Sequence, residues 1–119
     1  MKAVISSDFK LGILGGGQLG RMMLRVLNRY DIKNKVMDSN PKAPCSFGAG
    51  QFIVGDINNY EEVLVFGKDC DVVTYEIESV NVEALKELER RGVTVSPSSS
   101  VLEIIQDKRI QKQFYKCQY

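Results

Sequence analysis

The sequence contains no histidine among its 119 residues. Without histidine, Ser-His and Cys-His nucleophilic catalysis are excluded within this chain, and the commonest metal ligand is missing. Any chemistry carried by these residues must therefore use carboxylates, lysines, backbone amides or a metal held by oxygen atoms. We expect no metal site in this chain.

Long apolar runs are missing as well. No run of about eighteen apolar residues occurs, so no transmembrane span is expected, and Met1 to Asp8 lack the apolar core of a signal peptide. The three cysteines, Cys45, Cys70 and Cys117, are odd in number and widely spaced. Such a set is a poor disulfide framework and a poor zinc site. These absences predict a cytoplasmic protein with no membrane partner.

Neither sign of charge dominates. The chain has 16 basic and 15 acidic side chains, spread along the sequence rather than clustered. Nucleic acid is therefore not expected as a partner, because neutralising phosphates usually requires a strongly basic face. With 44% apolar residues, a chain of this length can bury one core and form one domain.

Short apolar segments alternate with segments of helical period. Strands are expected at 10–14, 35–38, 51–56, 71–75 and 93–95, and helices at 18–30, 59–66, 82–91 and from residue 100, with a second segment capped by Asp107. The alternation, with short links, predicts an α/β fold: a Rossmann-like parallel sheet of about five strands with flanking helices.

Three local signals refine these helices. Leu19, Met22, Met23, Val26 and Leu27 form one apolar stripe on the first helix. Asn58 or Asn59 is expected to cap the second, and a glycine at position 92 to end the third. The segment 100–103 matches a capping box that would open the last helix.

A glycine cluster follows the first expected strand. The segment Gly15–Gly20 satisfies G-x-G-x-x-G between a strand and a helix, which is the context that the motif requires. Its glycines permit a tight turn and a close backbone approach to a phosphate-bearing ligand at the helix start. Asp38 ends the second strand, where a dinucleotide enzyme carries its ribose-binding acid. Simple packing of helix on strand would also explain the glycines.

An acidic residue follows the fourth strand. Glu76 should emerge at the carboxyl edge of the sheet, on the same side as the glycine loop, where open α/β sheets bind ligands. A carboxylate there is suited to a hydroxyl or an amine of the ligand. The turn around Gly17 and Glu76 are therefore expected to converge on one pocket, although a solvated loop acid is the alternative.

Three blocks together carry a family resemblance: Gly12–Met22, Asp71–Glu78, and Gln106–Lys108 followed by Lys112–Phe114. In this order and spacing they resemble the N5-carboxyaminoimidazole ribonucleotide synthetases of the ATP-grasp superfamily. The resemblance implies that residues 1–116 form a Rossmann-like pre-ATP-grasp domain and 117–119 a tail. The ATP-grasp and carboxyl-terminal domains of such ligases would then lie outside this chain.

The resemblance also implies an activity. In de novo purine biosynthesis, ATP and bicarbonate would give carboxyphosphate, which carboxylates the amine of 5-aminoimidazole ribonucleotide. ATP and Mg²⁺ would be held mainly by the absent ATP-grasp domain, and the complete enzyme would be a homodimer. This chain alone would hold no catalytic residue and would be inactive.

Site residues follow from the resemblance by position. Those implied to bind the ribonucleotide are Gly15, Gly16, Gly17, Gln18, Leu19, Tyr75 and Glu76. Lys108 matches a basic residue, commonly arginine, that contacts ATP. Lysine keeps the charge but not the planar fork of arginine. Asp38 matches a family acid, and the resemblance assigns it no role.

Other readings remain open at this point. Within the same superfamily, the chain could belong to a formate-dependent glycinamide ribonucleotide transformylase or a biotin carboxylase. Thr74, Tyr75, Glu76 and Gln18 favour the synthetase over both. Gly17 and Asp38 motivate an NAD-binding oxidoreductase domain, although no NAD is expected. A non-catalytic remnant that binds a partner is the last alternative.

Overall fold

The computed structural model describes the backbone of residues 9–118 and the side chains of residues 9–108. Five strands form: β1 Lys10–Leu14, β2 Lys33–Asp38, β3 Gln51–Val54, β4 Val72–Tyr75 and β5 Thr94–Val95. The helices are α1 Gln18–Arg29, the short 3-10 helix η1 Pro44–Ser46, α2 Tyr60–Gly67, α3 Val82–Arg90 and α4 Ser99–Gln118.

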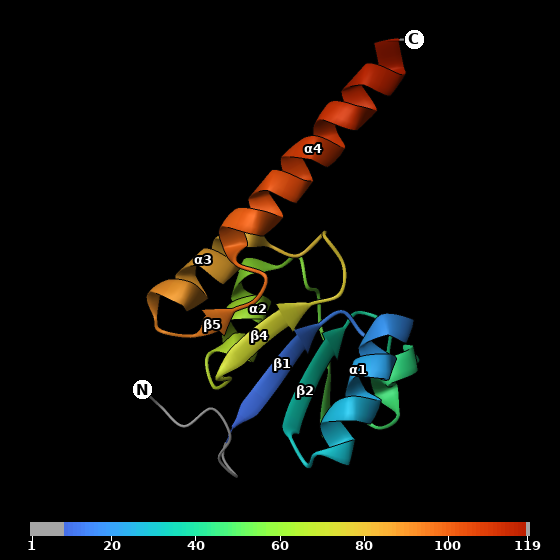
Figure 1. Cartoon of the computed structure of the whole chain (residues 1–119), viewed down its shortest axis with the longest axis vertical. Helices are drawn as coiled ribbons and strands as arrows, with labels where there is room; N and C mark the ends of the chain where they lie inside the picture. The colour runs from blue at the N-terminus through green and yellow to red at the C-terminus, as the bar shows by residue number, and fades with distance from the viewer. Residues whose placement is uncertain (1–8, 119) are drawn as a thin grey trace.

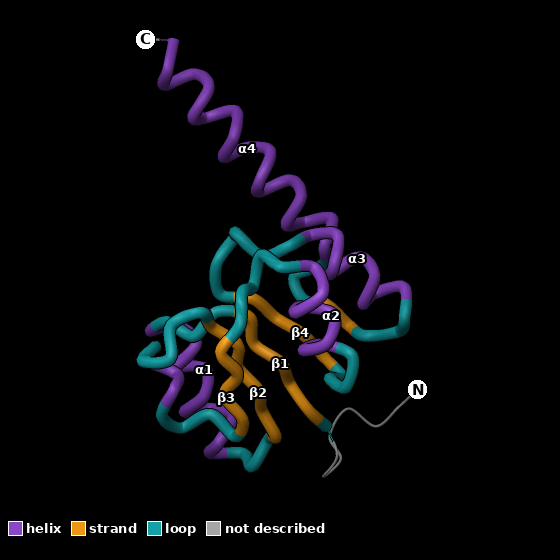
Figure 2. The backbone as a smooth tube through the Cα atoms, turned by 180° about the vertical axis from the view of Figure 1, so that it is seen from behind, coloured by secondary structure: helices purple, strands orange, loops and turns teal. Residues whose placement is uncertain are grey.

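The strands make one parallel sheet in the order β3-β2-β1-β4-β5 (Figures 1 and 2). Because every strand runs the same way, their carboxyl ends meet at one edge of the sheet. The order also places β1 at the centre: the chain runs outward from β1 to β2 and β3, then crosses back to β4 and β5 on the other side. The expected α/β fold with about five parallel strands is confirmed.

Two hydrophobic cores lie on opposite faces of this sheet. Ile13 and Leu14 are neighbours in β1, both are fully buried, and they belong to different cores because side chains alternate along a strand. The smaller core packs α1 on the sheet through Ile13, Leu24, Val36 and Cys45. The larger one packs α2, α3 and the start of α4 on the other face.

Helix ends follow the local signals in the sequence. The side chain of Asn59 accepts a hydrogen bond from the N–H of Glu62 (3.0 Å), so Asn59 is the cap of α2. Asn81 caps α3 in the same way by accepting from the N–H of Ala84 (2.9 Å). Gly92 has a φ of +95° directly after α3, a conformation that favours glycine.

The face that α1 turns toward the sheet differs from the predicted stripe. Leu24, which the stripe omitted, is buried, whereas Leu19, Met22 and Val26 are each more than half exposed. The helix is rotated so that Gly20 and Leu24 meet the sheet. Two apolar stripes overlap on this helix, and contact with the sheet decides which of them is buried.

The predicted opening of the last helix is wrong. Helix α4 begins at Ser99 and continues unbroken past Asp107, so no capping box forms at residues 100–103 and no second segment starts. Glu103 instead accepts a hydrogen bond from Lys86 of α3 (2.6 Å). The carboxylate of Glu89, also in α3, accepts from the backbone N–H of Ser99 (3.2 Å) at the start of α4.

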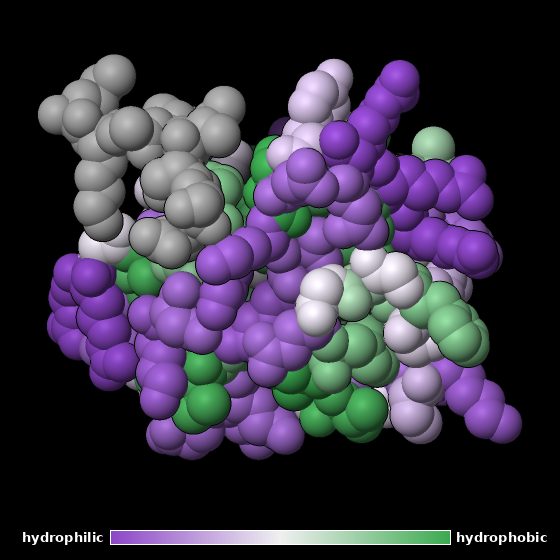
Figure 3. All heavy atoms as spheres, turned by 90° about the horizontal axis from the view of Figure 1, so that it is seen from below, coloured by the Kyte–Doolittle hydropathy of each residue, from purple (hydrophilic) through white to green (hydrophobic). Residues whose placement is uncertain are grey.

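The two ends of the molecule differ in character. Helix α4 extends away from the sheet beyond the carboxyl ends of the strands (Figure 1). The opposite end, seen from below, is largely hydrophilic with separate apolar patches (Figure 3). In the described part of the chain, no helix combines the length and the apolar character needed to cross a membrane.

Candidate functional site at the carboxyl edge of the sheet

The glycine loop joins β1 to α1 at the carboxyl edge of the sheet. Gly15 has a φ of +103°, and its N–H donates to the carbonyl oxygen of Met37 at the end of β2 (2.8 Å). Gly17 occupies the cap position of α1 and has no side chain to accept a hydrogen bond from the helix. The first turn of α1 therefore needs an acceptor from elsewhere in the fold.

Glu76 supplies that acceptor. Its own backbone N–H donates to the carbonyl oxygen of Leu14 (2.9 Å), which fixes it beside the start of the loop. Its side-chain Oε2 then accepts the N–H of Gly20 in the first turn of α1 (2.7 Å). The carboxylate thus caps a helix from a distant part of the chain, at the helix end where negative charge is stabilised.

Two glycines of the motif leave room for this carboxylate. A Cβ atom at Gly17 would overlap Oε1 of Glu76, and one at Gly20 would lie 2.6 Å from Oε2. In a dinucleotide site the same close approach serves a pyrophosphate. Here a protein carboxylate takes that space, so a second anion at the start of α1 would meet like charge. A hydrogen-bond donor suits the site better.

Asp38 lies on the other side of the same loop. Its Oδ2 accepts the N–H of Gly16 (2.7 Å) and its Oδ1 accepts the N–H of Asn40 (2.8 Å). Both oxygens therefore already have a protein donor. This arrangement differs from that of the dinucleotide enzymes, where the corresponding acid binds the ribose.

Cys45 completes the wall of the loop, and the sequence reasoning did not identify it. Its N–H donates to the carbonyl oxygen of Gly16 (3.0 Å), and its thiol lies 3.6 Å from the carbonyl oxygen of Gly17. Burial, with the nearby charges of Glu76 and Asp38, raises the pKa of the thiol to about 11. The only sequence signal was Pro44, the residue before Cys45 and the first of η1.

The other predicted site residues are distributed unevenly. Gln18 and Leu19 are exposed in the first turn of α1, next to the glycine loop. Tyr75 packs against the larger core on the opposite face from α1, and its hydroxyl has no hydrogen-bond partner among the described residues. Burial, with the charge of Glu89, raises the pKa of this phenol. The side chain of Tyr75 therefore lies on the other face of the sheet from α1, although its backbone lies beside Leu14 at the start of the loop, and its part in ligand binding remains a prediction.

Lys108 lies on α4 and is exposed. Two residues before it, Gln106 donates from its side chain to the carbonyl oxygen of Glu78 (2.7 Å). This bond ties the start of α4 to the loop that follows β4. Lys108 therefore projects from the helix that leaves the carboxyl edge of the sheet, whereas its contact with ATP remains a prediction.

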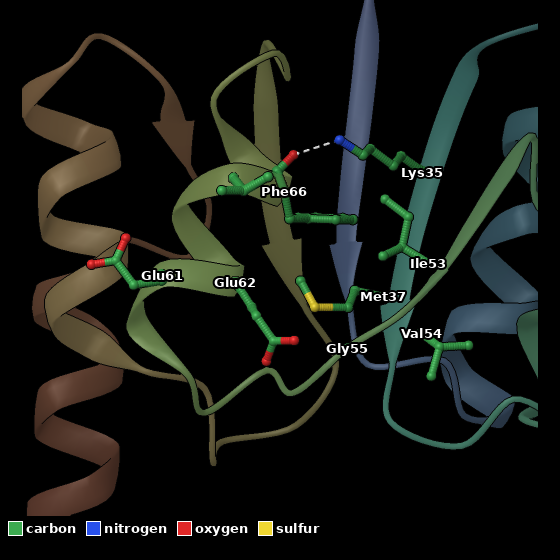
Figure 4. Close-up of a pocket in the computed structure, with 9 residues that line it drawn as sticks. Lys35, Met37, Ile53, Val54, Gly55, Glu61, Glu62 and Phe66 are labelled. Atoms are coloured by element: carbon green, nitrogen blue, oxygen red, sulfur yellow. Dashed lines mark hydrogen bonds between the residues drawn. The ribbon is translucent and has the colours of Figure 1, made fainter.

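A pocket of about 320 Å³ lies between α2 and the strands β2 and β3 (Figure 4). Met37, Ile53, Val65 and Phe66 contribute to its lining. Lys35 also lines the pocket, and its ammonium group donates to the carbonyl oxygen of Phe66 (2.8 Å) and to the carboxylate of Asp69 (2.9 Å). This cation is therefore already used by the fold, and the pocket lies on the opposite face of the sheet from α1.

Metal ligands do not gather at either place. Within residues 9–108, no group of three or more acidic or cysteine side chains is arranged to hold a metal ion. Asp38 and Glu76 both direct oxygens at backbone N–H groups of the glycine loop. These residues do not fit a magnesium site.

Comparison with known proteins decides the family. The model of the ribonucleotide synthetase preATP-grasp domain matches residues 9–106 of this chain. The chain belongs to this family. The phosphoribosylaminoimidazole carboxylase of Vigna aconitifolia, a chloroplastic protein, is 43% identical over 102 residues. That match covers 86% of this chain and 18% of the relative.

Solved structures agree with this membership. The N5-carboxyaminoimidazole ribonucleotide synthetase from Thermotoga maritima superimposes with a TM-score of 0.80 at 40% identity, covering 91% of this chain and 30% of that one. The carboxyaminoimidazole ribonucleotide synthase from Aspergillus clavatus, complexed with ATP, gives 0.78 at 38%, covering 90% and 28%. This preATP-grasp domain thus spans less than a third of the length of these relatives.

Proposed function

We propose that this preATP-grasp domain binds 5-aminoimidazole ribonucleotide for an ATP-dependent ligase that carboxylates it with bicarbonate in purine biosynthesis. Family membership and the names of the similar synthetases support this substrate. The ATP complex of the Aspergillus clavatus enzyme supports ATP as the second substrate. The observation that carries the proposal is the carboxylate of Glu76 held against the first turn of α1.

That carboxylate selects the kind of ligand group that can approach. Oε2 is engaged by Gly20, and Oε1 lies next to the Cα of Gly17, where a side chain would collide with it. An ionised carboxylate accepts hydrogen bonds and does not donate them. The ligand groups that suit it are hydroxyls and amines. Aminoimidazole ribonucleotide has both, in its ribose and in its exocyclic amine.

The role of this chain in the reaction is binding and orientation. ATP converts bicarbonate into an activated carboxyl donor, and magnesium with lysines would offset the phosphate charge. The ribonucleotide amine then attacks that carboxyl carbon, phosphate leaves and the amine loses a proton. A carboxylate at Glu76 would hold the nucleotide so that its amine faces the donor, and such positioning is a large part of catalysis.

The remaining groups are assigned to other parts of a longer ligase. We place the magnesium site and most ATP contacts in an ATP-grasp domain beyond residue 116, with Lys108 reaching ATP from the edge of this domain. We assign contacts with the ribonucleotide to the loop residues Gly15, Gly16, Gly17, Gln18 and Leu19. A homodimer and a cytoplasmic location are part of the same proposal.

Titration of the ¹⁵N-labelled chain with aminoimidazole ribonucleotide and, separately, with NADH tests the proposal. The ribonucleotide should shift the amide resonances of Gly16, Gly17 and Gly20, and NADH should leave them unchanged. Nuclear magnetic resonance detects binding even at millimolar affinity, which suits a domain that supplies only part of the contacts. Binding of NADH at these amides with no response to the ribonucleotide would contradict the proposal and favour an oxidoreductase domain.

A further inference from the structure

Asp38 connects two segments that are distant in the sequence. Its Oδ2 accepts the N–H of Gly16, 22 residues earlier, at 2.7 Å, and its Oδ1 accepts the N–H of Asn40 at 2.8 Å. The first bond reaches into the glycine loop, and the second closes a local turn after β2. Hydrogen bonds to an ionised acceptor are about twice as strong as neutral ones.

The peptide of Gly16 is held from both sides by the same segment. Its N–H is bound by Asp38, and its carbonyl oxygen accepts the N–H of Cys45 (3.0 Å). A Cβ at Gly16 would lie 3.2 Å from the Cβ of Asp38, so a side chain at position 16 would crowd that of Asp38. The next residue is Gly17, whose Cα faces Oε1 of Glu76. The position of Gly16 therefore controls how the loop meets that carboxylate.

The local turn alone does not explain Asp38. Asp56, which follows β3, makes an equivalent turn by accepting the N–H of Asn58 at 2.9 Å. That turn uses one carboxylate oxygen, and within residues 9–108 no hydrogen bond joins Asp56 to the glycine loop. Asp38 uses its second oxygen for the long-range bond to Gly16. Asp56 is thus a natural comparison for a carboxylate with a purely local role.

We infer that Asp38 is a positioning residue for ribonucleotide binding: it fixes the glycine loop so that Glu76 and the first turn of α1 are set for the ligand. This inference rests on the proposed function and assigns Asp38 a role that does not involve ligand contact. Fixing the loop before binding removes the cost of ordering it when the ligand arrives. Loss of the Gly16 bond should therefore weaken ribonucleotide binding without unfolding the domain.

The test compares Asp38→Asn with Asp56→Asn in the ¹⁵N-labelled chain. An asparagine side chain has one acceptor oxygen, so D38N can keep only one of the two bonds, and the turn after β2 favours asparagine. Amide hydrogen exchange is read at Gly16 and at Gly20, and ribonucleotide affinity is measured by titration. D38N should speed exchange at Gly16 by about tenfold and weaken the ribonucleotide by a similar factor, as expected for loss of a charged hydrogen bond. Gly20 should retain its protection, and D56N should behave as wild type.

Two results would overturn the inference: unchanged exchange at Gly16 in D38N, or unchanged ribonucleotide affinity in a D38N chain whose Gly16 amide has lost protection. Should D38N not fold, Asp38→Ser takes its place, because a serine hydroxyl can keep the local turn but is too short for the second bond. If the wild-type chain itself shows no ribonucleotide response, the proposed function fails. The exchange measurement then still decides whether Asp38 holds the loop.

Discussion

The backbone N–H of Gly20 and the carboxylate of Glu76 lie 2.7 Å apart, although 56 residues separate them in the chain. This bond joins the first turn of α1 to the loop after β4, across the carboxyl edge of the sheet. It places a carboxylate where the glycine motif would otherwise offer backbone N–H groups to a phosphate. The chemistry of the site follows from that replacement.

Gly20→Ala should destabilise the domain by about 2 kcal/mol, the usual cost of an overpacked site. The new Cβ would lie 2.6 Å from Oε2 of Glu76, 3.0 Å from the thiol sulfur of Cys45 and 3.1 Å from the carbonyl oxygen of Gly15. Alanine is otherwise the better helix former by about 1 kcal/mol, so a net loss of stability points to crowding against these three atoms. Urea denaturation measures the effect. The exposed Arg29→Ala in the same helix is the control, and a G20A chain as stable as wild type would contradict this prediction.

Leu24→Ala should cost about 3 kcal/mol, as for other fully buried leucines, whereas Val26→Ala should cost far less. Leu24 is 2% exposed in the smaller core, and Val26 is 55% exposed two residues later on the same helix. Denaturation of the two variants side by side shows which face of α1 packs on the sheet. Equal losses, or a larger loss for V26A, would restore the stripe predicted from the sequence.

The sequence predicted those features that depend on neighbouring residues. Asn58 or Asn59 was predicted to cap α2, and Asn59 does so through an N–H three residues ahead. Asn81 caps α3 with the same spacing and was not predicted. The five strands could be placed because each short apolar run ends at turn-forming residues. The buried face of α1 could not, because Leu24 and Val26 both fit a helical apolar period and only contact with the sheet distinguishes them.

The site was predictable as a location but not as a set of contacts. Parallel topology alone brings Glu76 and the glycine loop to one edge, and the structure places them together. The sequence could not indicate that Asp38 and Glu76 would direct their oxygens at backbone N–H groups, because those bonds span 22 and 56 residues. Cys45 was missed for the same reason, since its place depends on how the loop after β2 folds back.

Stability should fall as the pH rises from about 9 to about 11, because of two buried thiols. Burial raises the pKa of Cys45 and of Cys70 from 9.0 to about 11. Well below pH 9 both thiols are protonated in the folded and unfolded chain, so they contribute no pH dependence there. Between these values the unfolded chain loses thiol protons that the folded chain keeps, which favours unfolding.

Urea denaturation across this pH range measures the effect, with a Cys45→Ala/Cys70→Ala double variant as the control. Lysine and tyrosine side chains titrate in both proteins, so the difference between the two curves isolates the buried thiols. Above pH 9, the free energy of unfolding of the double variant should rise relative to that of wild type. Curves that stay parallel up to pH 11 would show that the thiols keep their ordinary pKa values.

The 119-residue chain should hydrolyse no ATP by itself. Its described side chains include no group of three or more acidic or cysteine residues that could hold a metal ion. The proposed function places most ATP contacts beyond residue 116. Phosphate release is measured with magnesium, bicarbonate and ATP, with and without the ribonucleotide. Release should equal that of buffer alone. Bicarbonate-stimulated hydrolysis by the purified chain would show that a catalytic site had been overlooked.

The central claim is that Glu76, rather than an anion site, receives the ribonucleotide, and titration of Glu76→Ala tests it most directly. Aminoimidazole ribonucleotide and inorganic phosphate are titrated separately into ¹⁵N-labelled wild-type, E76A and E61A chains. Glu61 is an exposed acid on α2 and serves as the matched control. We expect wild type and E61A to bind the ribonucleotide equally and E76A to bind it at least about tenfold more weakly, the cost of losing a hydrogen bond to a charged group. Equal affinity in a folded E76A chain, or phosphate alone reproducing the shifts at Gly17 and Gly20 in wild type, would contradict the account.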